Sequence, residues 1–146
     1  MIHSVNDSLT TANRLRPVLL RLGRHLRREI HSVGVTGGQV SLLVTIKMHP
    51  GITARELAER ERISAPGMSG QLVRLEAAQL IRRERASDRR RIGLFITAEG
   101  DRVLRSVKKK RTVWLAARLE RLTPEERAAV EAALPALERL LEGDGR

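Results

Sequence analysis

The side chains in this sequence that could do chemistry are mostly cations and small hydrogen-bonding groups, gathered in two short runs. One run spans residues 64–74 and the other spans residues 88–91. Serine and glutamine can pair with base edges, arginine can meet a phosphate or a guanine, and glycine lets a backbone approach a partner closely. The alternative interpretation is a solvated helix face followed by a charged surface turn. The candidate nucleic-acid-binding residues are Ser64, Pro66, Gly67, Ser69, Gly70, Gln71, Arg74, Asp88, Arg89, Arg90 and Arg91.

Motifs that mark an enzyme are missing. The sequence holds no GxxxxGK phosphate loop, GxSxG elbow, HExxH zinc helix or GxGxxG turn. Residues 67–70 are not a nucleophile elbow, because they lie inside a predicted helix that no buried strand precedes. The four histidines are dispersed, and His25 with Glu29 is more typical of a solvated ion pair than of a metal site. We therefore expect no catalytic activity, no metal and no cofactor.

The composition is that of one folded domain without thiols. Of the 146 residues, 41% are apolar and 31% are charged, which suits a modest core and is too apolar for a disordered chain. The absence of cysteine excludes a disulfide scaffold, a thiolate zinc site and a thiol redox switch. Polar residues interrupt the longest uncharged stretch, 30–46, and the amino terminus lacks a secretory signal. We expect no membrane span and a cytoplasmic location.

The net charge of +11 is unevenly distributed. Residues 1–119 carry 24 positive and 10 negative side chains, a sum of +14, whereas residues 120–146 carry 4 and 7, a sum of −3. Such a basic body suits a polyanion, through electrostatic steering and counterion release. A basic protein with no such partner is the alternative. Charge alone does not choose between DNA, RNA and an anionic membrane.

Two short helices joined by a tight turn are predicted to position the first run. A capping box of Thr53 and Glu56 opens the first helix, which ends near Arg62, and Ser64 caps the second, which continues through Ala78. The opposite face of the second helix would then present the candidate residues, and a major groove accepts a helix of this kind. Apolar side chains at helical spacing should bury the inner face: Leu57, Met68, Leu72 and Leu75.

A charged hairpin is predicted to position the second run. Residues 82–87 and 92–97 should form its strands, with Ile92 and every second residue after it pointing inward. The three arginines of residues 88–91 would project from a thin ribbon that could enter a minor groove, and Asp88 could hold one guanidinium in place. Two helices followed by such a hairpin have the order of a winged helix-turn-helix.

Amphipathic helices are predicted on both sides of this unit. The first has an apolar stripe over residues 15–30, and Pro17 must lie near its first turn or kink it. Further stripes cover residues 103–122 and 130–141, and Pro135 should kink the last helix. Apolar stripes of this length exceed what one small winged domain can cover. They therefore favour the pairing of two copies, with an intramolecular helical layer as the alternative.

The predicted fold class is mainly α with a small β-hairpin wing, a winged helix-turn-helix with N- and C-terminal dimerisation helices. Residues 1–35 form the N-terminal dimerisation helix, residues 36–98 the DNA-binding lobe and residues 99–146 the C-terminal dimerisation helices, in one compact domain overall. Within the lobe, a capping box of Thr36 and Gln39 opens a further helix that ends near residue 48.

The sequence resembles the multiple antibiotic resistance regulator (MarR) family of bacterial transcription factors over nearly its whole length. The most specific part is residues 86–100, which is similar to the family's Asp-x-Arg wing followed by an apolar strand and Thr-x-x-Gly. Val35-Thr36 with Gln39, and the segment 75–81, also lie where the family has similar residues.

The resemblance implies roles for particular residues. Arg90 is the wing arginine in the minor groove, Asp88 organises it, residues 64–74 hold the recognition helix, and the first and the last two helices pair two protomers. Gly70 is a departure, because many relatives carry a DNA-reading arginine there. The resemblance also implies that a small aromatic or anionic ligand binds between the dimerisation helices and the DNA-binding lobe and releases DNA. The missing cysteines exclude the family's thiol-sensing branch.

These observations predict a cytoplasmic, homodimeric, sequence-specific DNA-binding regulator, a repressor released by a small-molecule ligand. Its operator should be a palindrome with half-sites ~34–36 Å apart. The alternative is a sequence-tolerant architectural DNA-binding protein, which the basic charge would serve equally well. A protein of the membrane surface, working through the Arg-rich first helix, belongs to a different class, and the lack of Trp and Phe on that helix argues against it.

Overall fold

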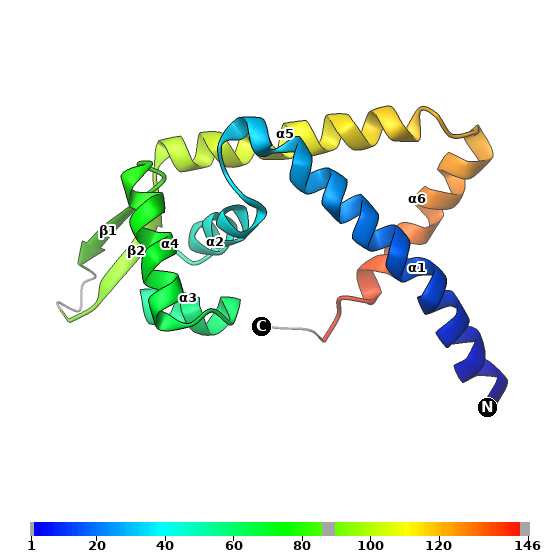
Figure 1. The fold of residues 1–146 in the computed structure, drawn as a ribbon, viewed down its shortest axis with the longest axis horizontal. Coiled ribbons are helices and arrows are strands. Elements are labelled where there is room, and N and C mark those ends of the chain that lie inside the picture. Colours follow the sequence, from blue (N-terminus) through cyan, green and yellow to red (C-terminus); the bar gives the residue numbers. More distant parts are fainter. Residues whose placement is uncertain (1, 86–89, 144–146) are drawn as a thin grey trace.

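The computed structural model describes residues 2–85 and 90–143, and it is mainly helical with one small antiparallel sheet (Figure 1). A lobe of helices and strands lies at one end, and α5 runs from it toward α6 at the other end. This architecture confirms the predicted fold class. The elements are α1 (Ile2–Glu29), a 3-10 helix (His31–Val33), α2 (Gly37–Met48), α3 (Ala54–Glu61), α4 (Ala65–Ala77), β1 (Ile81–Arg85), β2 (Ile92–Ile96), α5 (Ala98–Leu119) and α6 (Pro124–Arg139).

The helices begin where the sequence places capping hydroxyl groups. At the start of α2, Thr36 Oγ1 accepts a hydrogen bond from the Gln39 N–H at 3.1 Å, and the Gln39 side chain accepts one from the Thr36 N–H at 3.0 Å. Thr123 and Glu126 make the same reciprocal pair at the start of α6. Each pair satisfies two backbone N–H groups that the helix itself leaves without acceptors, so both capping boxes fix where their helices begin.

The capping box predicted at the start of α3 forms in one direction only. Thr53 Oγ1 accepts a hydrogen bond from the Glu56 N–H at 3.1 Å, but the Glu56 carboxylate pairs with the guanidinium of Arg91. A guanidinium offers a carboxylate stronger, charge-assisted hydrogen bonds than a neutral backbone N–H does. The prediction of a reciprocal box was therefore wrong, and Glu56 connects α3 to the hairpin.

The core lies where α2, α3, α4, β2 and the first turns of α5 meet. Helix α2 is central to it, since its residues Val40, Leu42, Leu43 and Ile46 are all buried. Burying an aliphatic side chain contributes roughly 1.5–3 kcal/mol, so this cluster holds α3 and α4 firmly against the rest of the lobe. The four apolar residues of α3 and α4 that the helical spacing predicted to be inside are buried, each at most 1% exposed: Leu57, Met68, Leu72 and Leu75.

The two strands pair in a register that sets Ile81 opposite Ile96. The loop between α2 and α3 crosses β2, where the Gly51 N–H donates a hydrogen bond to the Leu94 carbonyl at 2.9 Å. This close crossing requires glycine at position 93, because a Cβ on Gly93 would lie 2.8 Å from the Gly51 Cα. The loop therefore anchors the hairpin to the start of α3.

The prediction that Ile92 points inward was wrong. Its side chain is 51% exposed, whereas that of Leu94 is 1% exposed. Ile92 is the first residue of β2, toward the tip of the hairpin, and the packed helices of the core reach only as far as Leu94. Strand β1 begins one residue earlier than predicted, at Ile81, and β2 ends one residue earlier, at Ile96. Residues 86–89 lie outside the described part of the chain, so the predicted end of the first strand stays a prediction.

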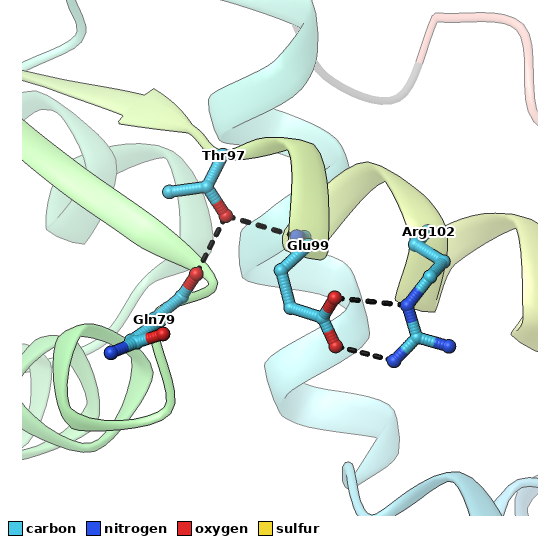
Figure 2. Close-up of polar contacts among 5 residues, drawn as sticks. Gln79, Thr97, Glu99 and Arg102 are labelled. Carbon is cyan, nitrogen blue, oxygen red and sulfur yellow. Dashed lines mark hydrogen bonds and ion pairs between the residues drawn. The ribbon is translucent and has the colours of Figure 1, made fainter.

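The start of α5 is locked against the turn between α4 and β1 (Figure 2). Thr97 Oγ1 accepts a hydrogen bond from the Gly100 N–H at 3.0 Å and donates one to the Gln79 carbonyl at 2.6 Å. A Cβ on Gly100 would lie 2.3 Å from the Leu80 carbonyl oxygen, so only glycine fits there. These contacts join the DNA-binding lobe predicted from the sequence to the long helix that follows it.

A side-chain pair reinforces the first turn of α5. Arg102 Nε donates a hydrogen bond to Glu99 at 2.9 Å, which lowers the pKa of the Glu99 carboxyl (Figure 2). A lowered pKa means that the pair stabilises the fold at neutral pH and loses this contribution as the pH falls through that pKa. The positive end of the helix dipole favours the same carboxylate.

The long helices α1, α5 and α6 extend beyond the core and leave many apolar side chains exposed. Where α1 packs on α5, the His25 ring stacks on Trp114 with centroids 5.3 Å apart, and the Arg118 guanidinium lies 5.0 Å from the Trp114 ring. Within the described ranges, no helix is both long enough and apolar enough to cross a membrane. The exposed side chains are Val5, Leu9, Val18, Leu19, Leu20, Leu22, Val113, Leu115, Val130 and Leu134.

Both helix prolines lie inside their helices. Helix α1 begins at Ile2, so Pro17 lies well beyond its first turn. Of the two predicted placements of Pro17, the one near the first turn is therefore excluded. Pro135 lies inside α6, which continues to Arg139 and ends before Leu141. Proline has no N–H, so each leaves the carbonyl four residues earlier without its usual helical donor.

Candidate nucleic-acid interface

Helix α4 presents one continuous face to solvent. Met68, Leu72 and Leu75 point into the core, and a helix advances about 100° per residue, so positions offset by two from this series lie on the opposite side. Gln71 is half-buried at the edge of the outer face. The other predicted residues of this run are all exposed: Ser64, Pro66, Gly67, Ser69, Gly70 and Arg74.

A tight turn sets the direction of α4. Arg62 ends α3 in the left-handed conformation, with φ 54° and ψ 44°. Ser64 then caps α4, and its Oγ accepts a hydrogen bond from the Gly67 N–H at 3.2 Å. The Ser64 side chain therefore caps α4, as predicted. Its predicted role at the interface is separate from this structural role. Its hydroxyl proton remains available for a partner at the exposed start of the helix.

Polar contacts hold α3 against α2. The Glu61 carboxylate accepts hydrogen bonds from the hydroxyls of Ser41 at 3.0 Å and Thr45 at 2.5 Å. Lys47 of α2 also pairs with Asp101 of α5 at 2.8 Å. The helix pair is thus tied on one side to α2 and through it to α5, which leaves the side formed by α4 and the hairpin open.

The structure describes two of the four predicted hairpin residues. Arg90 is exposed, and Arg91 pairs with Glu56, so the Arg91 side chain is directed to α3 and does not project freely from the hairpin. Asp88 and Arg89 lie outside the described residues. The predicted contact in which Asp88 holds a guanidinium therefore stays a prediction.

A hollow of about 800 Å³ joins the hairpin to α3, and cations from α3, from β1 and from the turn before β2 line it. Arg90 and Arg91 were predicted, whereas Arg55 and Arg83 were missed. Arg55 pairs with Glu59 at 3.5 Å and Arg83 pairs with Glu76 of α4. Both could have been found, because Arg55 follows the first residue of a predicted helix and lies off its apolar face. Arg83 lies on the outer side of a strand.

A second hollow continues this surface toward α4. It measures about 650 Å³, lies between α3 and α4, and includes Arg55, Arg83 and Ser69. The exposed face of α4 and the cations of the hairpin therefore belong to one surface on one side of the lobe. Val73 is a further exposed residue of α4 that the sequence analysis missed. Its exposure could have been predicted, because position 73 lies outside the buried series 68, 72, 75.

Comparison with known proteins identifies this arrangement. A model of the MarR family matches residues 33–92, which contain α2, α3, α4 and β1 and end at the first residue of β2. The HTH-type transcriptional repressor MdtR of Bacillus subtilis is 31% identical over 113 residues, which cover 77% of this chain and 73% of MdtR. A transcriptional regulator protein from Pseudomonas aeruginosa PA01 has 32% sequence identity to this chain. Its crystal structure matches with a TM-score of 0.82 over 95% of this chain and 99% of that one. A mutant of S. aureus MepR bound to an oligodeoxyribonucleotide shares the fold, with a TM-score of 0.70 at 21% identity over 90% of this chain and 98% of that one. The chain therefore belongs to the MarR family of winged helix-turn-helix transcriptional regulators.

Proposed function

We propose that this regulator binds a palindromic DNA operator as a homodimer, represses transcription and catalyses no reaction. The observation that carries the proposal is the exposed face of α4 beside the cations of the hairpin. A helix of this size enters a major groove, while an arginine-bearing hairpin reaches the neighbouring minor groove. The names of two similar proteins agree, since MdtR is a repressor and the MepR mutant binds an oligodeoxyribonucleotide. A repressor acts where the chromosome lies, which in a bacterium is the cytoplasm.

The proposal assigns a role to each part of the interface. Ser69 and Gln71 meet base edges, and Arg74 meets a phosphate or a guanine. Arg90 lies in the minor groove with Asp88 as its organiser. Arg55 and Arg83 add positive charge at the phosphates that lie between the two grooves. The remaining residues of the predicted set, which border these contacts, are Ser64, Pro66, Gly67, Gly70, Arg89 and Arg91.

A second copy of the chain covers the exposed apolar side chains of the long helices. The proposal assigns residues 1–35 and 99–146 to dimerisation and residues 36–98 to DNA binding. Side chains such as Leu19, which is 48% exposed, and Leu134, which is 47% exposed, would be buried between the protomers. A twofold dimer presents two recognition helices to half-sites ~34–36 Å apart, and the operator mirrors this symmetry.

We further propose that a small aromatic or anionic ligand releases the regulator from DNA. This part rests on the family alone. A ligand can act in this way only if it binds more tightly to dimers whose recognition helices are misplaced for DNA, with a coupling of about 1–3 kcal/mol in typical cases. The measurement is operator affinity in the presence of a panel of aromatic carboxylates. A panel that leaves the affinity unchanged contradicts this part of the proposal.

Selection of bound duplexes from a random pool at physiological salt, with the bound species sized in the same experiment, tests the central proposal. An enriched palindrome held by a dimer is the expected result. Uniform recovery of sequences, with specific and competitor affinities in a ratio near one, would favour the architectural alternative. Binding to anionic vesicles in the absence of duplex binding would favour a protein of the membrane surface.

A further inference from the structure

The centre of the exposed face of α4 is apolar. Pro66, Gly70, Val73 and Ala77 follow one another at the four- and three-residue spacing of a single helical stripe, and all four are exposed. This stripe lies opposite the buried stripe of Met68, Leu72 and Leu75. Polar side chains that could make hydrogen bonds, such as Ser69 and Arg74, lie on its flanks. The part of the helix that would go deepest into a groove therefore offers few polar groups.

Apart from the ring of Pro66, Val73 has the largest apolar side chain of this stripe, and this side chain does not pack in the core. Its side chain is 60% exposed and does not belong to the core cluster. Valine is also a poorer helix former than alanine, so helix propensity does not explain it. An exposed β-branched side chain at this place points to a contact with something outside the chain.

Gly70 leaves open space beside Val73. A Cβ on Gly70 would meet nothing within 4 Å, so packing within the protein does not require glycine there. In a helix a side chain leans toward the preceding turn, which directs the Val73 side chain over position 70. The result is a valine at the side of a shallow notch, with backbone at its floor.

Thymine fits this notch by its chemistry. Among the groups that base pairs show in the major groove, the C5 methyl of thymine is the apolar one, and apolar side chains recognise it by contact. We propose that Val73 reads a thymine C5 methyl in each half-site and that Gly70 makes room for it. The inference rests on the proposed DNA binding, and it predicts a T·A pair at one fixed position of each half-site of the operator.

Replacing thymine by deoxyuridine tests the contact, because this change removes the C5 methyl and leaves every hydrogen-bonding group in place. Each thymine of the selected operator is replaced in turn, and the affinity of the wild-type protein is measured for each duplex. Since a buried methyl group is worth a few-fold in affinity, one position should weaken binding about fourfold, and the same change in both half-sites about fifteenfold.

Val73→Ala identifies the side chain that reads the methyl. This variant should bind the thymine and deoxyuridine operators equally well, and selection with it should no longer enrich T·A at that position. Val44→Ala is the matched control, because Val44 is an exposed valine on α2, away from α4. The control should keep the full response to deoxyuridine. Val73→Thr, which keeps one methyl group, should keep part of it.

The outcomes separate this inference from the proposal on which it rests. A wild-type protein that binds a selected palindrome but tolerates deoxyuridine at every position overturns the methyl contact and leaves sequence-specific binding intact. Equal sensitivity of wild type and Val73→Ala also overturns the assignment to Val73. Failure to select any duplex would overturn the proposed function itself.

Discussion

Arg62 holds a backbone conformation that arginine seldom adopts. Its φ of 54° lies in the left-handed region, where a Cβ is crowded and glycine is not. We predict that Arg62→Gly is more stable to urea than Arg62→Ala by about 1 kcal/mol, because alanine keeps the crowded Cβ and glycine removes it. Comparing two variants that both lack the guanidinium isolates the backbone from the charge. If the two variants unfold at the same urea concentration, with equal slopes of free energy against urea, the turn carries no strain.

Arg90 is the residue at which the electrostatic part of the proposed binding is best measured. Arg90→Ala should weaken binding to all duplexes and reduce the slope of log K against log salt by about one, as expected for the loss of one phosphate or minor-groove contact. Arg139→Ala removes a charge near the end of α6, away from the interface, and serves as the control. A slope that changes equally in both variants would mean that only net charge matters.

Several residue-scale features could be predicted from the sequence, and the others depend on partners that are distant in the chain. Buried positions such as Leu72 follow from helical spacing, which is local. The carboxylate of Glu56 pairs with a side chain 35 positions later, and no local pattern shows that the hairpin returns to α3. Ile92 fits an alternating strand, but where the core ends along that strand depends on how the helices pack. Val73 has no hydrogen-bonding group, so the donor and acceptor chemistry that indicates its neighbours Ser69 and Arg74 does not indicate it.

At the scale of elements, the junction between β2 and α5 has the least tolerance for change. Gly100→Ala should lower the free energy of unfolding by about 1–3 kcal/mol, because its new Cβ collides with the Leu80 carbonyl, which cannot move without breaking its hydrogen bond from the Thr97 N–H. Gly70→Ala is the matched control in another helix. Its Cβ enters open space, so it should raise stability by roughly 0.5–1 kcal/mol. Equal effects of the two substitutions in urea unfolding would contradict this account.

Helix starts were easier to predict than helix ends. Thr36, Ser64 and Thr123 carry their signal in their own side chains, and each caps its helix as expected. The start of α1 has no such signal, so Pro17 could not be placed along the helix. Likewise α6 ends before the last residue of its apolar stripe, because an apolar stripe indicates a buried face and does not mark where the backbone stops being helical.

At the scale of the whole molecule, the long helices should hold two copies together. Leu19→Glu and Leu134→Glu place a carboxylate in the proposed subunit interface, where burying an unpaired charge is costly. Both variants should elute as monomers in size-exclusion chromatography and bind a full palindrome no better than a half-site. Val44→Glu, a similar change on α2 at a side chain 42% exposed, should stay dimeric. A dimer that survives both interface substitutions would place the contact elsewhere.

The clamp at the start of α5 has a mechanical consequence. The Thr97 and Gly100 contacts fix this helix to the proposed DNA-binding lobe, and its 22 residues span about 33 Å. A rigid lever of that length, tilted by about 6° where the subunits meet, moves the lobe by about 3.4 Å, the spacing of one base pair along DNA. In the proposed dimer, small adjustments in how the two copies pack would thereby be converted into a whole step of register between the half-sites.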